Sequence, residues 1–84
     1  MVRVKEVEVL GGYAVRLPFT DGTAREVDLE RYLRGPIFED VRDPDTFRTV
    51  KVDEELGTIV WPNGADIDPD VLYEDLAPAW ADPH

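Results

Sequence analysis

The sequence contains neither cysteine nor serine, and its single histidine is the last of 84 residues. Without cysteine there can be no disulfide and no thiolate metal site, which fits a reducing compartment. A serine–histidine or cysteine–histidine catalytic pair cannot be assembled, and zinc lacks the ligands that it prefers. We therefore expect no nucleophilic or zinc-dependent catalysis, and we interpret His84 as a terminal residue rather than a catalytic base.

Long apolar runs and glycine-rich loops are also missing. No apolar run approaches the roughly 18 residues that a membrane-spanning helix requires, and no charged-then-apolar leader opens the chain. We expect a cytoplasmic protein with no membrane partner. No glycine belongs to a phosphate-binding loop that ends in Lys-Ser or Lys-Thr, so the glycines are interpreted as turn residues. No cofactor or metal ion is expected.

Basic residues are absent from the last third of the chain. All nine lysines and arginines lie at or before Lys51, whereas residues 52–84 contain nine acidic residues. The formal net charge of −10 at pH 7 opposes direct binding to nucleic acid and favours a basic partner. Solubility and helix capping also account for acidic residues. The basic residues on strand segments are expected to screen acidic residues on neighbouring strands. The basic set is Arg3, Lys5, Arg16, Arg25, Arg48 and Lys51, and the acidic set is Glu6, Glu8, Glu26 and Asp28.

The composition indicates one small folded domain over residues 1–84. Hydrophobic residues make up 43% of the chain, which is too many for a disordered segment despite the charge. A domain of this length buries only roughly 60–65% of the surface that its unfolded chain exposes, so its core is thin. We expect an ordered core over about residues 2–76 and a loose tail over 77–84.

Alternation of apolar and polar residues predicts three strands in a meander over the first third of the chain. The clearest covers residues 13–19, where Tyr13, Val15, Leu17 and Phe19 alternate with other residues. The preceding valines alternate with a one-residue slip between Val4 and Val7, which indicates a bulge or a strand that begins at Lys5. Turns at Gly11-Gly12 and Asp21-Gly22 connect these strands to each other and to a third strand over 23–28.

The second half predicts one hairpin and several short helices. Strands over 48–53 and 58–61 are joined by a polar loop, and helical segments follow the capping residues Asp28, Asp43 and Asp68. The last helix is expected over 69–76. The predicted fold class is therefore α+β: a small antiparallel sheet of about five strands, a meander plus a hairpin, with short helices and the last helix packed on the sheet.

Asp66, Asp68 and Asp70 are spaced like the start of a calcium-binding loop. The match then fails, because Val71 stands where that loop needs glycine and Ala77 where it needs a bidentate glutamate. Helix capping explains Asp68, and the helix dipole favours an anion at Asp70 in the first turn. These residues therefore predict a helix start rather than a metal site.

Two tryptophans suggest a recognition surface, since aromatic side chains are good interface anchors. Core packing is the alternative; it is favoured for Trp61, whereas Trp80 suits either interpretation. The interaction candidates are Trp61, Asn63, Asp66, Asp70, Tyr73 and Trp80.

Four stretches of the sequence resemble one known family. They are Phe19-Thr20-Asp21-Gly22, Gly35-Pro36-Ile37-Phe38-Glu39 followed by Asp43 and Phe47, the run from Gly57 to Asp66, and Leu72-Tyr73. Together they resemble the bacterial family of uncharacterised domains DUF2442 over nearly the whole chain. The resemblance implies a small α+β domain with an antiparallel sheet, and it implies no activity, cofactor or catalytic residue.

The resemblance also implies a regulatory setting. Similar domains can be joined to a helix-turn-helix module, and their genes often lie beside other small genes in arrangements that look like toxin–antitoxin pairs. Only eight residues follow Leu76, which is too few for a DNA-binding module. Any regulatory role is therefore expected to need a partner.

These observations lead to two functional hypotheses. The first is a non-enzymatic protein-interaction module, one component of a toxin–antitoxin-like or transcription-regulatory pair, whose acidic last third binds a basic protein partner. An edge strand could also pair with its copy in a homodimer. The alternative is a small-molecule or divalent-metal binding domain, including a hydrolytic one, that uses carboxylates beside Trp61 and Tyr73.

Overall fold

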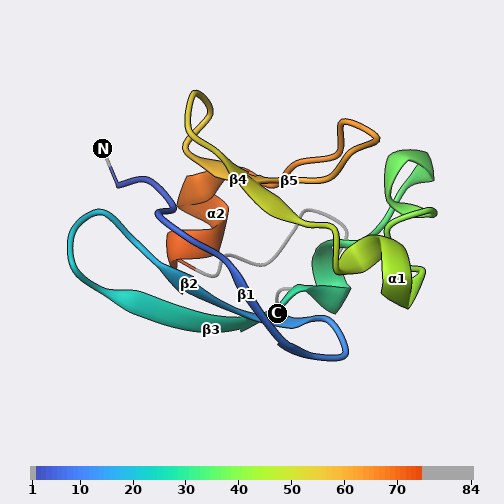
Figure 1. The fold of residues 1–84 in the computed structure, drawn as a ribbon, viewed down its shortest axis with the longest axis horizontal. Helices are drawn as coiled ribbons and strands as arrows, with labels where there is room; N and C mark the ends of the chain where they lie inside the picture. Colours follow the sequence, from blue (N-terminus) through green and yellow to red (C-terminus); the bar gives the residue numbers. More distant parts are fainter. Residues whose placement is uncertain (1, 75–84) are drawn as a thin grey trace, which may run out of the picture.

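The computed structural model describes residues 2–74 and has the α+β fold that the sequence predicts (Figure 1). Its elements in chain order are β1 (Glu8–Gly11), β2 (Ala14–Pro18), β3 (Ala24–Asp28), the 3-10 helices η1 (Leu29–Tyr32) and η2 (Pro36–Phe38), α1 (Pro44–Phe47), β4 (Lys51–Asp53), β5 (Thr58–Val60) and α2 (Pro69–Glu74). The five strands form two small antiparallel sheets, one ordered β1-β2-β3 and the other β4-β5. Trp80 and the predicted tail lie outside the described residues.

The central strand β2 confirms the predicted alternation. Val15, Leu17 and Phe19 point into the core and are at most 2% exposed, whereas Arg16 is exposed. The register places Arg16 opposite Glu8 on β1 and Glu26 on β3, so one of the basic strand residues lies between two of the acidic ones.

The first hairpin differs from the prediction in one detail. Gly11 pairs with Ala14, so the turn is formed by Gly12 and Tyr13 instead of Gly11 and Gly12. The cause is a register shift between Val9 and Gly11, which moves the turn by one residue. The slip predicted from the sequence lies between Val4 and Val7, whereas the register shift lies between Val9 and Gly11. Val4 makes an isolated bridge to Phe19 rather than extending β1.

All three predicted capping aspartates accept a backbone hydrogen bond at the start of a helix. Asp28 accepts from the amide of Glu30 at 3.0 Å, and Asp43 accepts from that of Thr46 at 3.1 Å. Asp68 accepts from the amide of Asp70 at 2.8 Å. The helices after Asp28 and Asp43 are single turns, because Gly35-Pro36 and the start of β4 follow closely.

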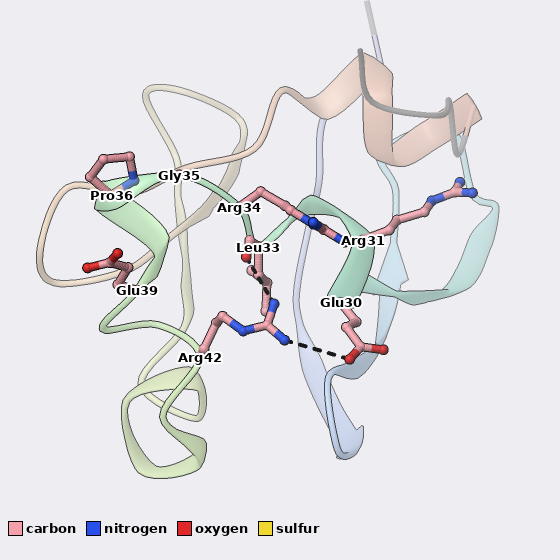
Figure 2. A pocket seen from close by; sticks show the side chains of 8 residues that line it. All are labelled: Glu30, Arg31, Leu33, Arg34, Gly35, Pro36, Glu39 and Arg42. Atoms are coloured by element: carbon pink, nitrogen blue, oxygen red, sulfur yellow. Dashed lines mark hydrogen bonds and ion pairs between the residues drawn. The ribbon is translucent and has the colours of Figure 1, made fainter. Parts of the chain in front are cut away.

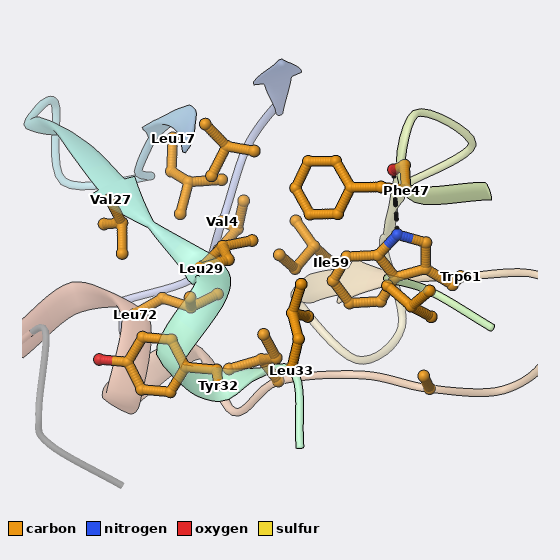
Figure 3. Close-up of a cluster of buried hydrophobic side chains, with 14 of the residues drawn as sticks. Val4, Leu17, Val27, Leu29, Tyr32, Leu33, Phe47, Ile59, Trp61 and Leu72 are labelled. Carbon is orange, nitrogen blue, oxygen red and sulfur yellow. Dashed lines mark hydrogen bonds between the residues drawn. The ribbon is translucent and has the colours of Figure 1, made fainter. Parts of the chain in front are cut away.

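Buried side chains of both sheets and of α2 form one hydrophobic cluster (Figure 3). Within this cluster the indole N–H of Trp61 donates to the carbonyl oxygen of Phe47 at 3.1 Å, and the two ring centroids are 5.9 Å apart. Leu72 is fully buried in the same cluster, which confirms that the last helix packs on the core. The two sheets are therefore held together by one shared core.

We expect Ile59→Val to lower the free energy of unfolding by about 0.5–1.5 kcal/mol, because Ile59 is fully buried and the removed methylene leaves a gap. The same substitution at Ile37, which is 48% exposed, is the matched control and should change stability by less than about 0.5 kcal/mol. Urea denaturation of the two variants measures both values. Equal losses at the two positions would contradict the described core.

Candidate functional site

The turn between β4 and β5 presents acidic side chains on a fixed backbone. One carboxylate oxygen of Asp53 accepts from the amides of Glu55 and Leu56, at 2.9 and 3.1 Å. The amide of Gly57 donates to the carbonyl oxygen of Asp53 at 2.7 Å and closes the turn. Glu54, Glu55 and Leu56 are exposed, Leu56 by 52%. An apolar side chain thus stands next to two carboxylates on the surface.

Two residues of the N-terminal segment, Arg3 and Val4, donate hydrogen bonds to the backbone of this turn. The guanidinium of Arg3 donates to the carbonyl oxygens of Glu54 and Glu55, the latter at 2.8 Å. The amide of Val4 donates to the carbonyl oxygen of Gly57 at 2.8 Å. Gly57 has a φ of +68°, and a Cβ atom there would lie 2.8 Å from the Cζ atom of Arg3. Glycine at this position therefore admits both the backbone conformation and the arginine.

The start of α2 lies at the same end of the hairpin as this turn (Figure 1). An isolated bridge joins Val60 to Asp66, and the buried hydroxyl of Thr58 donates to the carbonyl oxygen of Ile67. The chain after the next turn therefore runs back along β5 and brings Asp68 beside the β4–β5 turn. We call the exposed carboxylates gathered here the acidic end; they are Glu54, Glu55, Asp68 and Asp70.

Trp61 and Asn63, at the other end of β5, have structural contacts. Trp61 is 2% exposed, so the favoured core interpretation is confirmed and its ring is not a recognition surface. The side-chain amide of Asn63 donates to the carbonyl oxygen of Ile37 at 2.8 Å, and its oxygen accepts from the amide of Ala65 at 3.0 Å. Asn63 thus ties the turn after β5 to η2.

Tyr73 joins α2 to the β2–β3 turn. Its hydroxyl donates to a carboxylate oxygen of Asp21 at 2.7 Å, and the other oxygen of Asp21 accepts from the hydroxyl and amide of Thr23 at 2.6 and 3.0 Å. The Tyr73 ring meets Phe19 edge-on, with centroids 5.0 Å apart, and the guanidinium of Arg25 lies 5.4 Å from its centroid. Tyr73 therefore orients α2 against the first sheet.

These contacts change the acidity of both partners. The hydrogen bond from the Thr23 hydroxyl, and after it that from Tyr73, stabilises the carboxylate and lowers the pKa of Asp21 below its ordinary value of 3.8. The hydrogen bond to Asp21 and the charge of its carboxylate raise the pKa of Tyr73 above its ordinary value of 10.0.

The structure does not gather the predicted candidates into one site. Asp66 and Asp70 are exposed, Trp61 is in the core, and Trp80 lies outside the described residues. Over residues 2–74, no group of three histidine, cysteine, aspartate or glutamate side chains is placed to hold a metal ion. Within the same range, every helix falls short of the length and apolarity needed to cross a membrane.

A hollow beside η1 and η2 is a second candidate site, and the sequence analysis did not identify it (Figure 2). Its volume is about 660 Å³, and its lining is formed by Glu30, Arg31, Leu33, Arg34, Gly35, Pro36, Glu39 and Arg42. We call it the basic hollow because three arginines contribute to it. The spacing of Arg31 and Arg34 is the one feature of the sequence that could have indicated this site, whereas nothing in the pattern places Arg42 in the same lining.

Fold and surface together define a small α+β domain with an acidic end and a basic hollow. The chain belongs to the DUF2442 family of proteins of unknown function, whose model matches residues 4–77. This establishes the family that the sequence motifs suggested.

One solved structure gives a closer comparison. It comes from Nitrosomonas europaea and is described as that of a "putative DNA binding protein". The two chains share 30% sequence identity with a TM-score of 0.67, and the match covers 74% of this chain and 41% of that one. This chain therefore corresponds to less than half of the Nitrosomonas europaea protein. Among proteins with curated descriptions, none matches.

The Asp21–Tyr73 contact should depend on pH at both extremes. Because folding lowers the pKa of Asp21, its contribution to stability is present above pH 3.8 and is lost as the pH falls through the lowered pKa. Because folding raises the pKa of Tyr73, its contribution is present below pH 10.0 and is lost as the pH rises through the raised pKa. NMR titration should show that Thr23→Val raises the pKa of Asp21 most and Tyr73→Phe by less. An unchanged pKa in both variants would disprove the contact.

The Arg3 contact with the β4–β5 turn predicts an asymmetry between two glycines. Gly12 has a φ of +54°, and a Cβ atom added there would have nothing within 4 Å, so Gly12→Ala should cost only the left-handed backbone penalty of about 1–2 kcal/mol. Gly57→Ala should cost more, because it also displaces the guanidinium of Arg3. Urea denaturation of the two variants should show this difference in the free energy of unfolding. The difference should disappear when both substitutions are made in the Arg3→Ala background. A difference that persists without Arg3 would contradict this account.

Proposed function

We propose that this protein is a non-enzymatic interaction module of a toxin–antitoxin-like or transcription-regulatory pair, and that it binds a basic protein through the acidic end. The observation that carries the proposal is the fixed turn with exposed Glu54, Glu55 and Leu56 beside Asp68 and Asp70. A turn already held by Asp53 and Arg3 loses little freedom on binding, which favours affinity. The exposed Leu56 side chain adds apolar contact area next to the carboxylates of Glu54 and Glu55.

Charge supports a basic partner rather than a neutral one. Residues 52–84 carry nine acidic side chains and no basic one. Arg3 also lies at the acidic end, but backbone carbonyl oxygens already engage its guanidinium. A field of this sign accelerates encounter with a positively charged surface, and its effect falls steeply with salt.

The comparison supports a regulatory setting. The Nitrosomonas europaea protein is described as DNA-binding, yet more than half of it lies outside the part that this chain covers. A net charge of −10 opposes direct contact between this chain and DNA. We infer that the chain acts as one component and that a separate basic partner makes any contact with DNA.

A comparison of two triple variants in affinity capture from host lysate tests the proposal. The first variant, Glu54→Gln/Glu55→Gln/Asp68→Asn, neutralises the acidic end and keeps a capping side chain at position 68. The control, Glu6→Gln/Asp40→Asn/Asp45→Asn, neutralises three exposed carboxylates elsewhere. At low salt the natural protein and the control should retain the same basic protein, and the first variant should retain at least tenfold less.

High salt should release the partner from the natural protein and from the control, because the attraction is between exposed charges. Equal retention by both variants would show that the acidic end is not the interface. Identification of the retained protein by mass spectrometry then gives the partner for purified binding measurements.

A further inference from the structure

The basic hollow has a chemistry opposite to that of the acidic end and independent of it. Three of the nine basic residues of the chain line it, although the chain as a whole is acidic. Its volume of about 660 Å³ lies within the roughly 300–1,000 Å³ typical of small-molecule sites. Two carboxylates, Glu30 and Glu39, share the lining with the arginines.

Arg42 is held in a fixed position in the hollow. Its guanidinium donates to the carbonyl oxygen of Leu33 at 3.0 Å and lies 3.7 Å from a carboxylate oxygen of Glu30 (Figure 2). It also lies 5.6 Å from the ring centroid of Tyr13, whose hydroxyl donates to the backbone carbonyl oxygen of Arg42. A guanidinium has five N–H donors, so these contacts leave donors available to a ligand.

Arg34 differs from Arg42 because it makes no side-chain hydrogen bond or ion pair with residues 2–74. Figure 2 shows the Arg34 and Arg42 side chains on either side of Leu33, with Glu39 nearer to Pro36. Gly35, with a φ of +91°, makes the sharp bend between Arg34 and η2. The hollow thus offers one fixed and one unengaged guanidinium, with a carboxylate farther along the lining.

We propose that the basic hollow binds a small molecule that carries a phosphate group and, on its other side, an amine or hydroxyl group. Two guanidinium groups suit a doubly charged phosphate, which can accept paired hydrogen bonds from both. Glu39 can accept a hydrogen bond from the amine or hydroxyl group of the same ligand. The proposal does not rest on the protein partner, because no residue of the acidic end lines the hollow.

Calorimetric titration with three probes tests the proposed site. Phosphoethanolamine carries both groups, inorganic phosphate carries only the anion, and ethanolamine carries only the amine. We expect phosphoethanolamine to bind more tightly than phosphate, and ethanolamine not to bind. Arg34→Gln should weaken phosphoethanolamine binding at least tenfold, whereas Arg48→Gln, an exposed arginine outside the hollow, should leave it unchanged.

Two further variants make the test specific. Arg34→Lys keeps the charge but loses the paired donors, and should also weaken binding. Glu39→Gln should reduce the affinity for phosphoethanolamine to that for inorganic phosphate. Circular dichroism confirms that the variants are folded.

Three results would overturn the proposal. They are the absence of saturable binding by any phosphate probe, equal losses in the Arg34 and Arg48 variants, and binding of a DNA duplex through Arg34 with no binding of phosphoethanolamine. The last result would assign the hollow to a nucleic-acid backbone instead of a small molecule.

Discussion

The packing of Trp61 against Phe47 is the contact on which the rest of the structure depends. A domain of this size has a thin core, and here Trp61 is among its largest buried side chains while the indole N–H donates to the Phe47 carbonyl oxygen. Phe38 meets the same indole edge-on, with centroids 6.0 Å apart. These contacts join β5, α1 and η2, so one side chain links the hairpin to the helical segments. The turn after β5 closes on the same residue, because the backbone amide of Trp61 donates to the carbonyl oxygen of Ala65 at 2.9 Å and its carbonyl oxygen accepts from the amide of Gly64 at 2.9 Å.

Some side chains of the domain hold the fold together, whereas others present charge at its surface. Three of the predicted interaction residues hold elements together through side-chain hydrogen bonds: Trp61 to Phe47, Asn63 to Ile37 and Tyr73 to Asp21. The exposed features are of another kind: four carboxylates at one end of the β4–β5 hairpin, and three arginines around a hollow beside η1 and η2. A small acidic domain can in this way carry two surfaces of opposite sign, one suited to a basic protein and the other to an anion.

Local features of the fold could be predicted from the sequence because each depends on adjacent residues. The alternation through Val15 and Leu17 and the capping aspartates are examples. The bulge before Gly11 and the division into two sheets could not be predicted, because they depend on contacts distant in sequence, such as the bridge from Val4 to Phe19. The sequence showed that the last third of the chain is acidic, but not that Asp68 lies beside the β4–β5 turn. The basic hollow was missed since Arg42 reaches it through contacts with Tyr13 and Leu33.

The central claim is that the acidic end is the surface that meets a basic partner. Mapping of backbone amide chemical shifts in the natural protein, on addition of the purified partner, tests it most directly. The account predicts that the largest changes fall on Glu54, Glu55 and Leu56 and at the start of α2, and that they fade as salt is added. Changes concentrated along β3 or around Arg34, with the β4–β5 turn unaffected, would contradict it.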